Sequence, residues 1–216
     1  MDPVTVPPVS FYRDGSSEAR EPPVPWPRPP SRLMAASSAS AEAIARLQRE
    51  RKDWRKDRPP NFVAKPQTLA DGSSNLFAWD IKIPAKPSSI WAPGRYAATM
   101  TFKPDYPQTA PVVKFKLIDS KPLFHPNVYE DGGVCLDLIN PPESTHGYGK
   151  GGTWKPTLNF KTVLLALQTF LDEPNMGSPA QQAPYKLLKQ DEAAYKKKVS
   201  EQVAKVEHCG LDDGAE

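Results

Sequence analysis

The feature that most constrains the fold is a series of short segments in which apolar and polar residues alternate. Residues 76–83, 95–102 and 113–117 show this pattern, and a further short strand is expected near residues 62–64. Alternation with a period of two is typical of strands that bury one face. Asp-Gly and Pro-Gly turns separate the segments. Strands joined by short turns indicate an antiparallel meander, one face of which other elements must cover.

The alternation also predicts which side chains face the core. The list for the second and third segments is Tyr96, Ala98, Met100, Phe102, Val113, Phe115 and Leu117.

Three helical patterns can supply the cover. The first is expected over residues 41–57, with Ser40 as its N-cap. The second, residues 159–171, is apolar over so much of its surface that it must be buried. The third covers residues 179–207 and is expected to break near Pro184.

Composition divides the chain of 216 residues into three parts. Residues 1–38 are rich in proline and poor in large apolar residues, so a disordered extension is expected there. Residues 39–207 form the predicted folded domain, and residues 208–216 a polar tail.

Several classes of protein are disfavoured by charge and cysteine content. The net charge of +3 is too small to argue for nucleic acid, and no apolar run approaches the roughly 18 residues of a membrane span. The two cysteines, Cys135 and Cys209, lie far apart and match neither a disulfide framework nor a zinc site. A reducing compartment is therefore expected, with no metal.

Cys135 is the candidate nucleophile because it lies in a long irregular segment, residues 121–157, of a kind that is often functional. The alternatives without nucleophilic catalysis are a buried, inert thiol and a redox-sensing thiol. His125 could act as a base, but no third orienting group supports a Cys–His protease. Asn127 could instead donate hydrogen bonds to an oxyanion, which suits acyl transfer through a thioester. Gly132 and Gly133 would leave room for an incoming chain terminus.

A second candidate site is a basic stripe on the first predicted helix. Arg51, Arg55 and Arg58 are spaced at i, i+4 and i+7. The stripe is either a solvated face or a binding site for an acidic partner.

These motifs resemble a known family. FHPNVY followed by GGVCLDL, with the cysteine eight residues after the asparagine, is similar to the signature of ubiquitin-conjugating enzymes. RLQRERKDWRKDRP, DGSSNLFAWDIKIP and TWKPTLNFKTVLLALQTFLDEPNMGSPAQ resemble the SUMO-conjugating members, and the similarity covers about residues 41–206.

The resemblance implies the α+β fold of the ubiquitin-conjugating (UBC) family. Its parts would be an N-terminal helix, a four-stranded antiparallel meander, a central helix and C-terminal helices. It also implies that Cys135 accepts SUMO from the activating enzyme as a thioester and passes it to substrate lysines without a cofactor.

Individual residues take roles by the same resemblance. Asn127 would stabilise the oxyanion, His125 would shape the loop, and Tyr129 would line the approach of the lysine. The basic stripe would bind the activating enzyme and a second, non-covalent SUMO. The remaining expected partner contacts are Lys114, Pro179, Ala180 and Gln181.

The implied partners are SUMO, its activating enzyme, SUMO ligases and substrate proteins, with no nucleic acid and no membrane. A monomer in the nucleus and cytoplasm is expected.

The sequence departs from the family pattern at the expected acceptor site. Ser178 replaces an aspartate that orients the incoming lysine, and a phosphate on Ser178 would restore negative charge. The groove that would read a hydrophobic-Lys-x-Glu peptide has lost one lysine, at Val112. It has gained acid at Glu130 and Asp131, with Gly133 in place of a threonine. A weaker preference for the acidic residue is expected.

Two alternatives stay open. One is a carrier for ubiquitin or another ubiquitin-like modifier, which the helix sequence ERKDWRKD and the segment from Pro87 to Trp91 argue against. The other is a non-catalytic scaffold with the same fold, which would need neither Cys135 nor Asn127.

Overall fold

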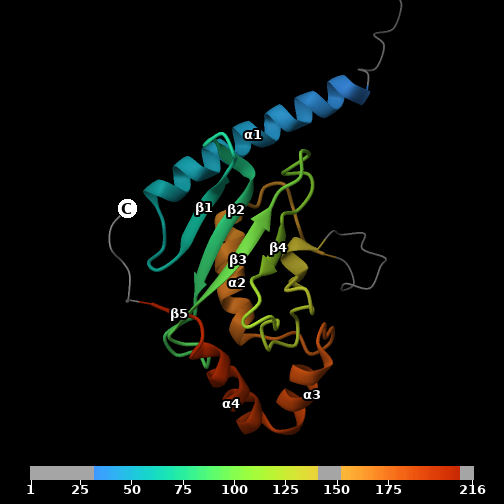
Figure 1. The fold of residues 1–216 in the computed structure, drawn as a ribbon. Coiled ribbons are helices and arrows are strands. Elements are labelled where there is room, and N and C mark those ends of the chain that lie inside the picture. The colour runs from blue at the N-terminus through green and yellow to red at the C-terminus, as the bar shows by residue number, and fades with distance from the viewer. Residues whose placement is uncertain (1–31, 141–151, 210–216) are drawn as a thin grey trace, which may run out of the picture. The chain divides into compact units, whose positions relative to one another are not determined.

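The computed structural model describes residues 32–140 and 152–209, with side chains from Ser40 onward, and these residues belong to one compact unit. The fold is α+β, as expected (Figure 1). None of the helices in the described ranges has the length and hydropathy of a membrane span. The elements in chain order are α1 (Arg32–Lys56), β1 (Val63–Thr68), β2 (Ser74–Pro84), β3 (Gly94–Thr101), β4 (Val112–Phe115), the 3₁₀ turn η1 (Asp137–Ile139), α2 (Phe160–Asp172), α3 (Gln182–Gln190), α4 (Glu192–Val203) and β5 (Glu207–His208).

The sheet is the predicted antiparallel meander, with the order β1-β2-β3-β4. β2 and β3 pair over the longest stretch, from Ala78 opposite Thr101 to Pro84 opposite Arg95. β1 contains Pro66, and its register shifts between Pro66 and Gln67. β4 is short, and Gly133 forms a bridge to Lys114 on it.

The predicted core face of the sheet is confirmed with one exception. Tyr96, Ala98, Met100, Phe102, Val113 and Phe115 are all buried, whereas Leu117 is 47% exposed. The expectation for Leu117 is wrong because β4 ends at Phe115. The chain then enters a turn in which Asp119 and Ser120 adopt positive φ angles.

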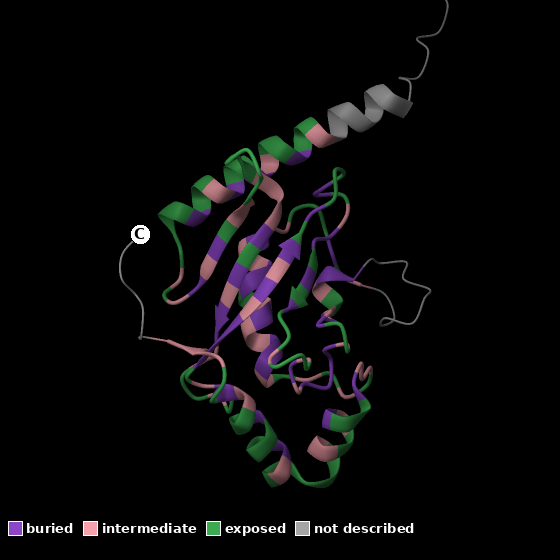
Figure 2. Cartoon of the chain, viewed as in Figure 1, coloured by how far each residue is buried: buried purple, intermediate pink, exposed green. Residues whose placement is uncertain are grey.

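Helix α2 covers the buried face of the sheet, as predicted, and buried residues gather where the two meet (Figure 2). Asn159 caps the helix by accepting a hydrogen bond from the Thr162 amide at 2.9 Å. The Phe160 ring lies with its centroid 4.8 Å from that of Trp79 on β2 and 5.5 Å from that of Trp54 on α1. This aromatic cluster joins α1, α2 and the sheet.

Helix α1 is longer than predicted, since it begins at Arg32 and includes Ser40. Ser40 is therefore not the N-cap, and residues 32–38 belong to a helix and not to a disordered extension; residues 1–31 lie outside the described residues. The physical reason is that residues 32–40 contain neither glycine nor proline to end the helix. Leu47 and Trp54 are buried, and Arg58 lies two residues beyond the end of α1.

The C-terminal helical segment breaks at Asp191 and not near Pro184. Pro184 is the third residue of α3, where its missing N–H leaves no intrahelical hydrogen bond unmade. Asp191 ends α3 and caps α4, because its Oδ1 accepts a hydrogen bond from the Ala194 amide at 2.9 Å. Tyr195, Val199 and Val203 of α4 are buried, as predicted.

The predicted polar tail is partly ordered on the sheet. β5 pairs with the start of β3, and Glu207 forms ion pairs with Lys82 (2.6 Å) and with the buried Arg95. The Cys209 amide donates to the Pro93 carbonyl at 2.9 Å. Residues 210–216 lie outside the described residues.

A buried carboxylate fixes α1 against the rest of the domain. Glu50 is 7% exposed and forms an ion pair with Arg46. Its oxygens also accept hydrogen bonds from the Tyr106 hydroxyl at 2.8 Å and the Phe160 amide at 2.9 Å. One side chain therefore joins α1 to the start of α2 and to the loop after β3.

Replacing Glu50 with alanine should lower the free energy of unfolding by about 2–4 kcal/mol, because buried donors lose their acceptor. Urea unfolding of the parent and of Glu50→Ala measures this. Asp53→Ala, an exposed change on the same helix, is the control and should stay within about 0.5 kcal/mol of the parent. Equal losses in the two variants would contradict a fixing role for Glu50.

Candidate functional site

Cys135 lies at the end of a tightly hydrogen-bonded loop that returns from Asn127. The Cys135 amide donates to the Asn127 carbonyl at 2.9 Å, and Val128 and Val134 form a bridge. At the tip, the Tyr129 amide donates to the Gly133 carbonyl at 2.8 Å. Cys135 is a free cysteine with 6% of its surface exposed. The backbone under the thiol is thus fixed before any partner arrives.

From the sequence, Gly132 was expected to leave room for the approach of a second chain. The structure shows a different reason for a glycine here, which is close packing within the domain. Its φ angle is +84°, and a Cβ atom there would lie 2.2 Å from the Phe115 carbonyl oxygen. The Phe115 amide in turn donates to the Gly132 carbonyl at 2.8 Å. Gly132 therefore lets the loop pair closely with β4.

The Asn127 side chain joins the cysteine loop to the segment before α3. Its Oδ1 accepts a hydrogen bond from the Asn175 amide at 2.7 Å. Its Nδ2 donates to the carbonyls of Asn175 at 2.8 Å and Ser178 at 3.0 Å. Because Asn127 is fully buried and both its amide hydrogens are engaged, it has no free donor for an oxyanion in this arrangement.

His125 is also fully buried, and it packs against aromatic rings. Its ring centroid lies 4.4 Å from that of Phe170 and 6.0 Å from that of Trp91. Burial lowers the pKa of His125 from 6.5 to about 3, so the imidazole is neutral at ordinary pH. Nδ1 accepts a hydrogen bond from the Asn127 amide at 3.1 Å. This environment suits a residue that shapes the loop and not a proton carrier.

The segment from Ser178 to Gln181 lies against the same loop. The amides of Ala180 and Gln181 both donate to the Pro126 carbonyl, at 2.7 and 2.9 Å. Gln181 was expected to contact a partner, but its side chain is buried and donates to the Leu123 carbonyl at 2.8 Å. Ser178 and Pro179 are half-buried, and the Ser178 carbonyl is held by Asn127.

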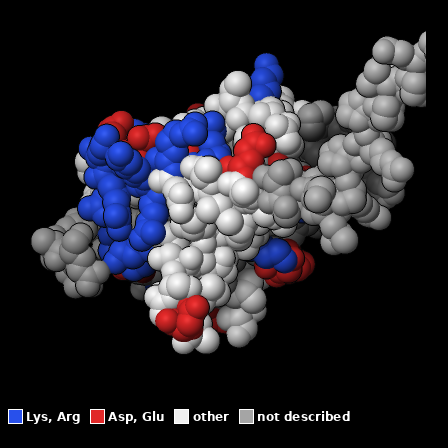
Figure 3. All heavy atoms as spheres, turned by 90° about the horizontal axis from the view of Figure 1, so that it is seen from above, with Lys and Arg blue, Asp and Glu red and all other residues white. Residues whose placement is uncertain are grey.

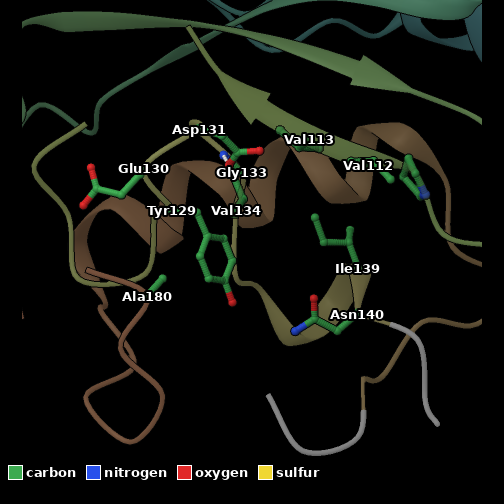
Figure 4. A pocket seen from close by; sticks show the side chains of 11 residues that line it. Val112, Val113, Tyr129, Glu130, Asp131, Gly133, Val134, Ile139, Asn140 and Ala180 are labelled. Carbon is green, nitrogen blue, oxygen red and sulfur yellow. Dashed lines mark hydrogen bonds between the residues drawn. The ribbon is translucent and has the colours of Figure 1, made fainter. Parts of the chain in front are cut away.

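A groove of about 590 Å³ runs beside the cysteine loop (Figure 4). Val134, which precedes Cys135, lines it together with Tyr129 and Ala180. Val112 and Val113 of β4 and Ile139 add apolar surface. The structure thus brings Tyr129 and Ala180 together in a hollow that adjoins the candidate nucleophile.

Lys114 is engaged at the rim of this region. Its Nζ lies 2.5 Å from Asp131 Oδ2, and both side chains are more than half exposed. Asp131 Oδ1 also accepts a hydrogen bond from the Gly133 amide at 3.0 Å. The hydrogen bond from Lys114 is the main reason that the pKa of Asp131 lies below its ordinary value. The one lysine retained here is therefore paired with an acid from the loop.

None of the three arginines of the basic stripe is among the described residues that line this groove. Lys and Arg side chains gather over part of the face seen from above, where α1 lies (Figure 3). Arg55 and Arg58 are exposed and Arg51 is half-buried. None of these three arginines forms an ion pair with the described residues.

Two asparagines near the site were missed in the sequence. Asn175 supplies the backbone groups that bind Asn127, which no side-chain pattern could reveal. Asn140 lines the groove because η1 brings the chain back beside β4. Neither residue stands out in composition or spacing.

Comparison with known proteins identifies the relatives of the chain. The family model described as "Ubiquitin-conjugating enzyme" matches residues 46–203. The SUMO-conjugating enzyme UBC9 of Caenorhabditis elegans is 42% identical over 77% of this chain and 92% of its own length. The Sumo-conjugating enzyme ubc9 of Dictyostelium discoideum is 44% identical over 73% of this chain and 91% of its own. The SUMO-conjugating enzyme SCE1 of Arabidopsis thaliana is 44% identical over 74% of this chain and 92% of its own length.

The buried histidine makes stability depend on pH. Between pH 6.5 and about 3 the unfolded chain binds a proton that folded His125 does not, so stability falls as the pH is lowered. The loss approaches about 1.4 kcal/mol per pH unit within this window. Urea unfolding of the parent and of His125→Gln at about pH 7, 6 and 5 should show this slope in the parent only.

An NMR titration provides the independent check. A His125 ring signal that titrates near pH 6.5 in the folded protein would contradict the buried, neutral state.

Proposed function

Since this chain belongs to the ubiquitin-conjugating enzyme family, we propose that it is a SUMO-conjugating enzyme that carries SUMO as a thioester on Cys135. The observation that carries the proposal is the identity of 42–44% to three SUMO-conjugating enzymes over 91–92% of their lengths. The free Cys135, held on a fixed loop beside a groove, supports it.

The proposed reaction has two transfers. The Cys135 thiolate attacks the thioester that joins SUMO to the activating enzyme, a new C–S bond forms, and the thiolate of the activating enzyme leaves. A substrate lysine amine then attacks the carbonyl carbon, a C–N bond forms, and the Cys135 thiolate leaves. The amine loses its proton to solvent, and the product is an isopeptide.

Positioning accounts for most of the assistance that the site would give. A thioester is already reactive toward an amine, so holding the two reactants in line is the main requirement. His125 is neutral and buried, so it would hold the loop and not move a proton. Tyr129 lines the groove along which we propose that the lysine approaches.

We propose that the main role of Asn127 is to position the site. Its amide fixes Asn175 and Ser178 relative to the Cys135 loop. To act also as the oxyanion donor, Asn127 would have to release one of these two carbonyls when the tetrahedral intermediate forms.

The partner surfaces follow from charge and position. We assign Arg51, Arg55 and Arg58 to the activating enzyme and to non-covalent SUMO, since these arginines have no ion-pair partner among the described residues. Substrates and ligases would approach from the side of the groove. A carrier for ubiquitin is the second candidate, because the family model that matches is named for ubiquitin conjugation.

A charging assay tests the proposal and its rival together. The protein is mixed with ATP, magnesium and matched activating enzymes, with SUMO and ubiquitin offered in parallel. We expect an adduct with SUMO that thiols cleave and that Cys135→Ala abolishes. Cys209→Ala, which removes the other cysteine, should charge normally. An adduct with ubiquitin alone would favour the rival, and no adduct with either would favour a scaffold.

Changing Asn127 to alanine should slow transfer to lysine by roughly 10²-fold, with much less effect on charging, because transfer would need both the segment that Asn127 holds and the donor that it releases to the oxyanion. Single-turnover discharge and charging rates measure the two steps. Asn175→Ala removes the Oδ1 contact with the Gly177 amide in the same segment but keeps Asn127, so it controls for a loosened loop. Equal losses in both steps for Asn127→Ala would show that the residue only maintains structure.

A further inference from the structure

The groove beside Cys135 has an apolar floor and an acidic rim. The apolar side chains are Val112, Val113, Val134 and Ile139, and Val112 is 44% exposed. Among the described residues of its lining, Glu130 and Asp131 alone are charged. No lysine or arginine lines the groove within the described ranges.

The nearest basic group on β4 does not offset this acidity. Lys114 is bound by Asp131, whose other oxygen is held by the Gly133 amide, so the pair is fixed to the loop from both sides. Glu130 is exposed and forms no ion pair within the described part of the chain. One negative charge therefore stays uncompensated at the rim, and an acidic side chain placed there would be repelled.

A second observation indicates that the groove receives a ligand with hydrogen-bond acceptors. Asn140 is 8% exposed, yet its Nδ2 has no hydrogen-bond partner among the described residues. In Figure 4 the Asn140 amide points toward the side of the groove on which Tyr129 lies. A buried donor without an acceptor is costly, and a peptide carbonyl is the acceptor that an extended chain would supply.

We infer that this groove binds the substrate segment that flanks the acceptor lysine and selects apolar and basic side chains there, against acidic ones, with Asn140 donating to a backbone carbonyl of that segment. This inference rests on the proposed function, because it assigns the groove to substrates of the Cys135 thioester. The substrate segment is the fitting occupant because Val134, the residue immediately before Cys135, lines the groove.

Asp131 is then the residue that sets the preference. Its carboxylate forms an ion pair with Lys114, the lysine of β4 that could otherwise bind an acidic substrate side chain. Removing this charge frees Lys114 and leaves the apolar floor unchanged.

The test uses short peptides with a single lysine, an apolar residue before it, and Glu, Gln or Arg at the second position after it. Arginine supplies positive charge without adding an acceptor amine. SUMO-charged protein is discharged onto each peptide in single-turnover reactions. For the parent we expect Arg to react fastest and Glu slowest, with about two- to fivefold between neighbouring members of the series.

Two variants of the groove and one matched control sharpen the test. Asp131→Asn should speed the Glu peptide and slow the Arg peptide by about two- to fivefold each. Asp80→Asn removes the same charge from the equally exposed Lys116–Asp80 pair outside the groove, and it should leave the order unchanged. Asn140→Ala should raise KM for all three peptides by about three- to tenfold while kcat and the order stay as in the parent.

The same peptides are also titrated against uncharged protein, so the preference is measured whether or not a thioester forms. Failure to charge Cys135 would overturn the proposed function, and the binding order would still decide this inference. Fastest transfer to, or tightest binding of, the Glu peptide by the parent would overturn it. So would an Asp131→Asn variant with the same preference as Asp80→Asn.

Discussion

The arrangement of the site depends on the hydrogen bonds of one buried asparagine. The Asn127 side chain binds backbone groups of Asn175 and Ser178, while its own carbonyl accepts the Cys135 amide. Asn127 therefore contacts the candidate nucleophile's backbone and the segment that leads into α3 at once, and the Ala180 and Gln181 amides strengthen the same junction by donating to the Pro126 carbonyl. His125 adds a further contact through Nδ1 from within the core. An amide suits this position because it offers donors and an acceptor together without bringing a buried charge.

The site therefore has a hydrogen-bonded centre around Cys135 and a more exposed rim around the groove. Around Cys135 the backbone of the loop and the Asn127 side chain are held by hydrogen bonds, and the pKa of His125 is too low for proton transfer at ordinary pH. Further out lie Ser178, the Lys114–Asp131 ion pair and the unpartnered Nδ2 of Asn140. Side-chain changes at the rim can alter which substrates bind while the hydrogen bond from the Cys135 amide to the Asn127 carbonyl stays in place, because no rim side chain takes part in that bond.

The fold could be predicted from the sequence wherever burial of one face spaces the apolar residues at regular intervals. Alternation placed the strands, and the apolar surface of residues 159–171 placed α2 in the core. Errors arose where the cause is local: nothing breaks the helix before Ser40, Asp191 caps two helices, and Leu117 follows the end of its strand. At the site, motif and spacing singled out Cys135, Asn127 and His125, which the structure places on one hydrogen-bonded loop. The engagement of Asn127 and the burial of Gln181 depend on backbone partners far away in sequence, which no pattern encodes.

The edges of the sheet bear on how the chain behaves at high concentration. Exposed strand edges are templates on which a second molecule can add a strand, and aggregation often begins there. Here the β1 edge carries Pro66, which lacks a donor, and a register shift that interrupts a continuous ladder. The β4 edge is four residues long and meets Gly133, while β5 covers the part of β3 that extends past β4. Growth of the sheet from molecule to molecule is thus discouraged at both ends, so crowding should favour contacts through side chains and leave the backbone ladder intact.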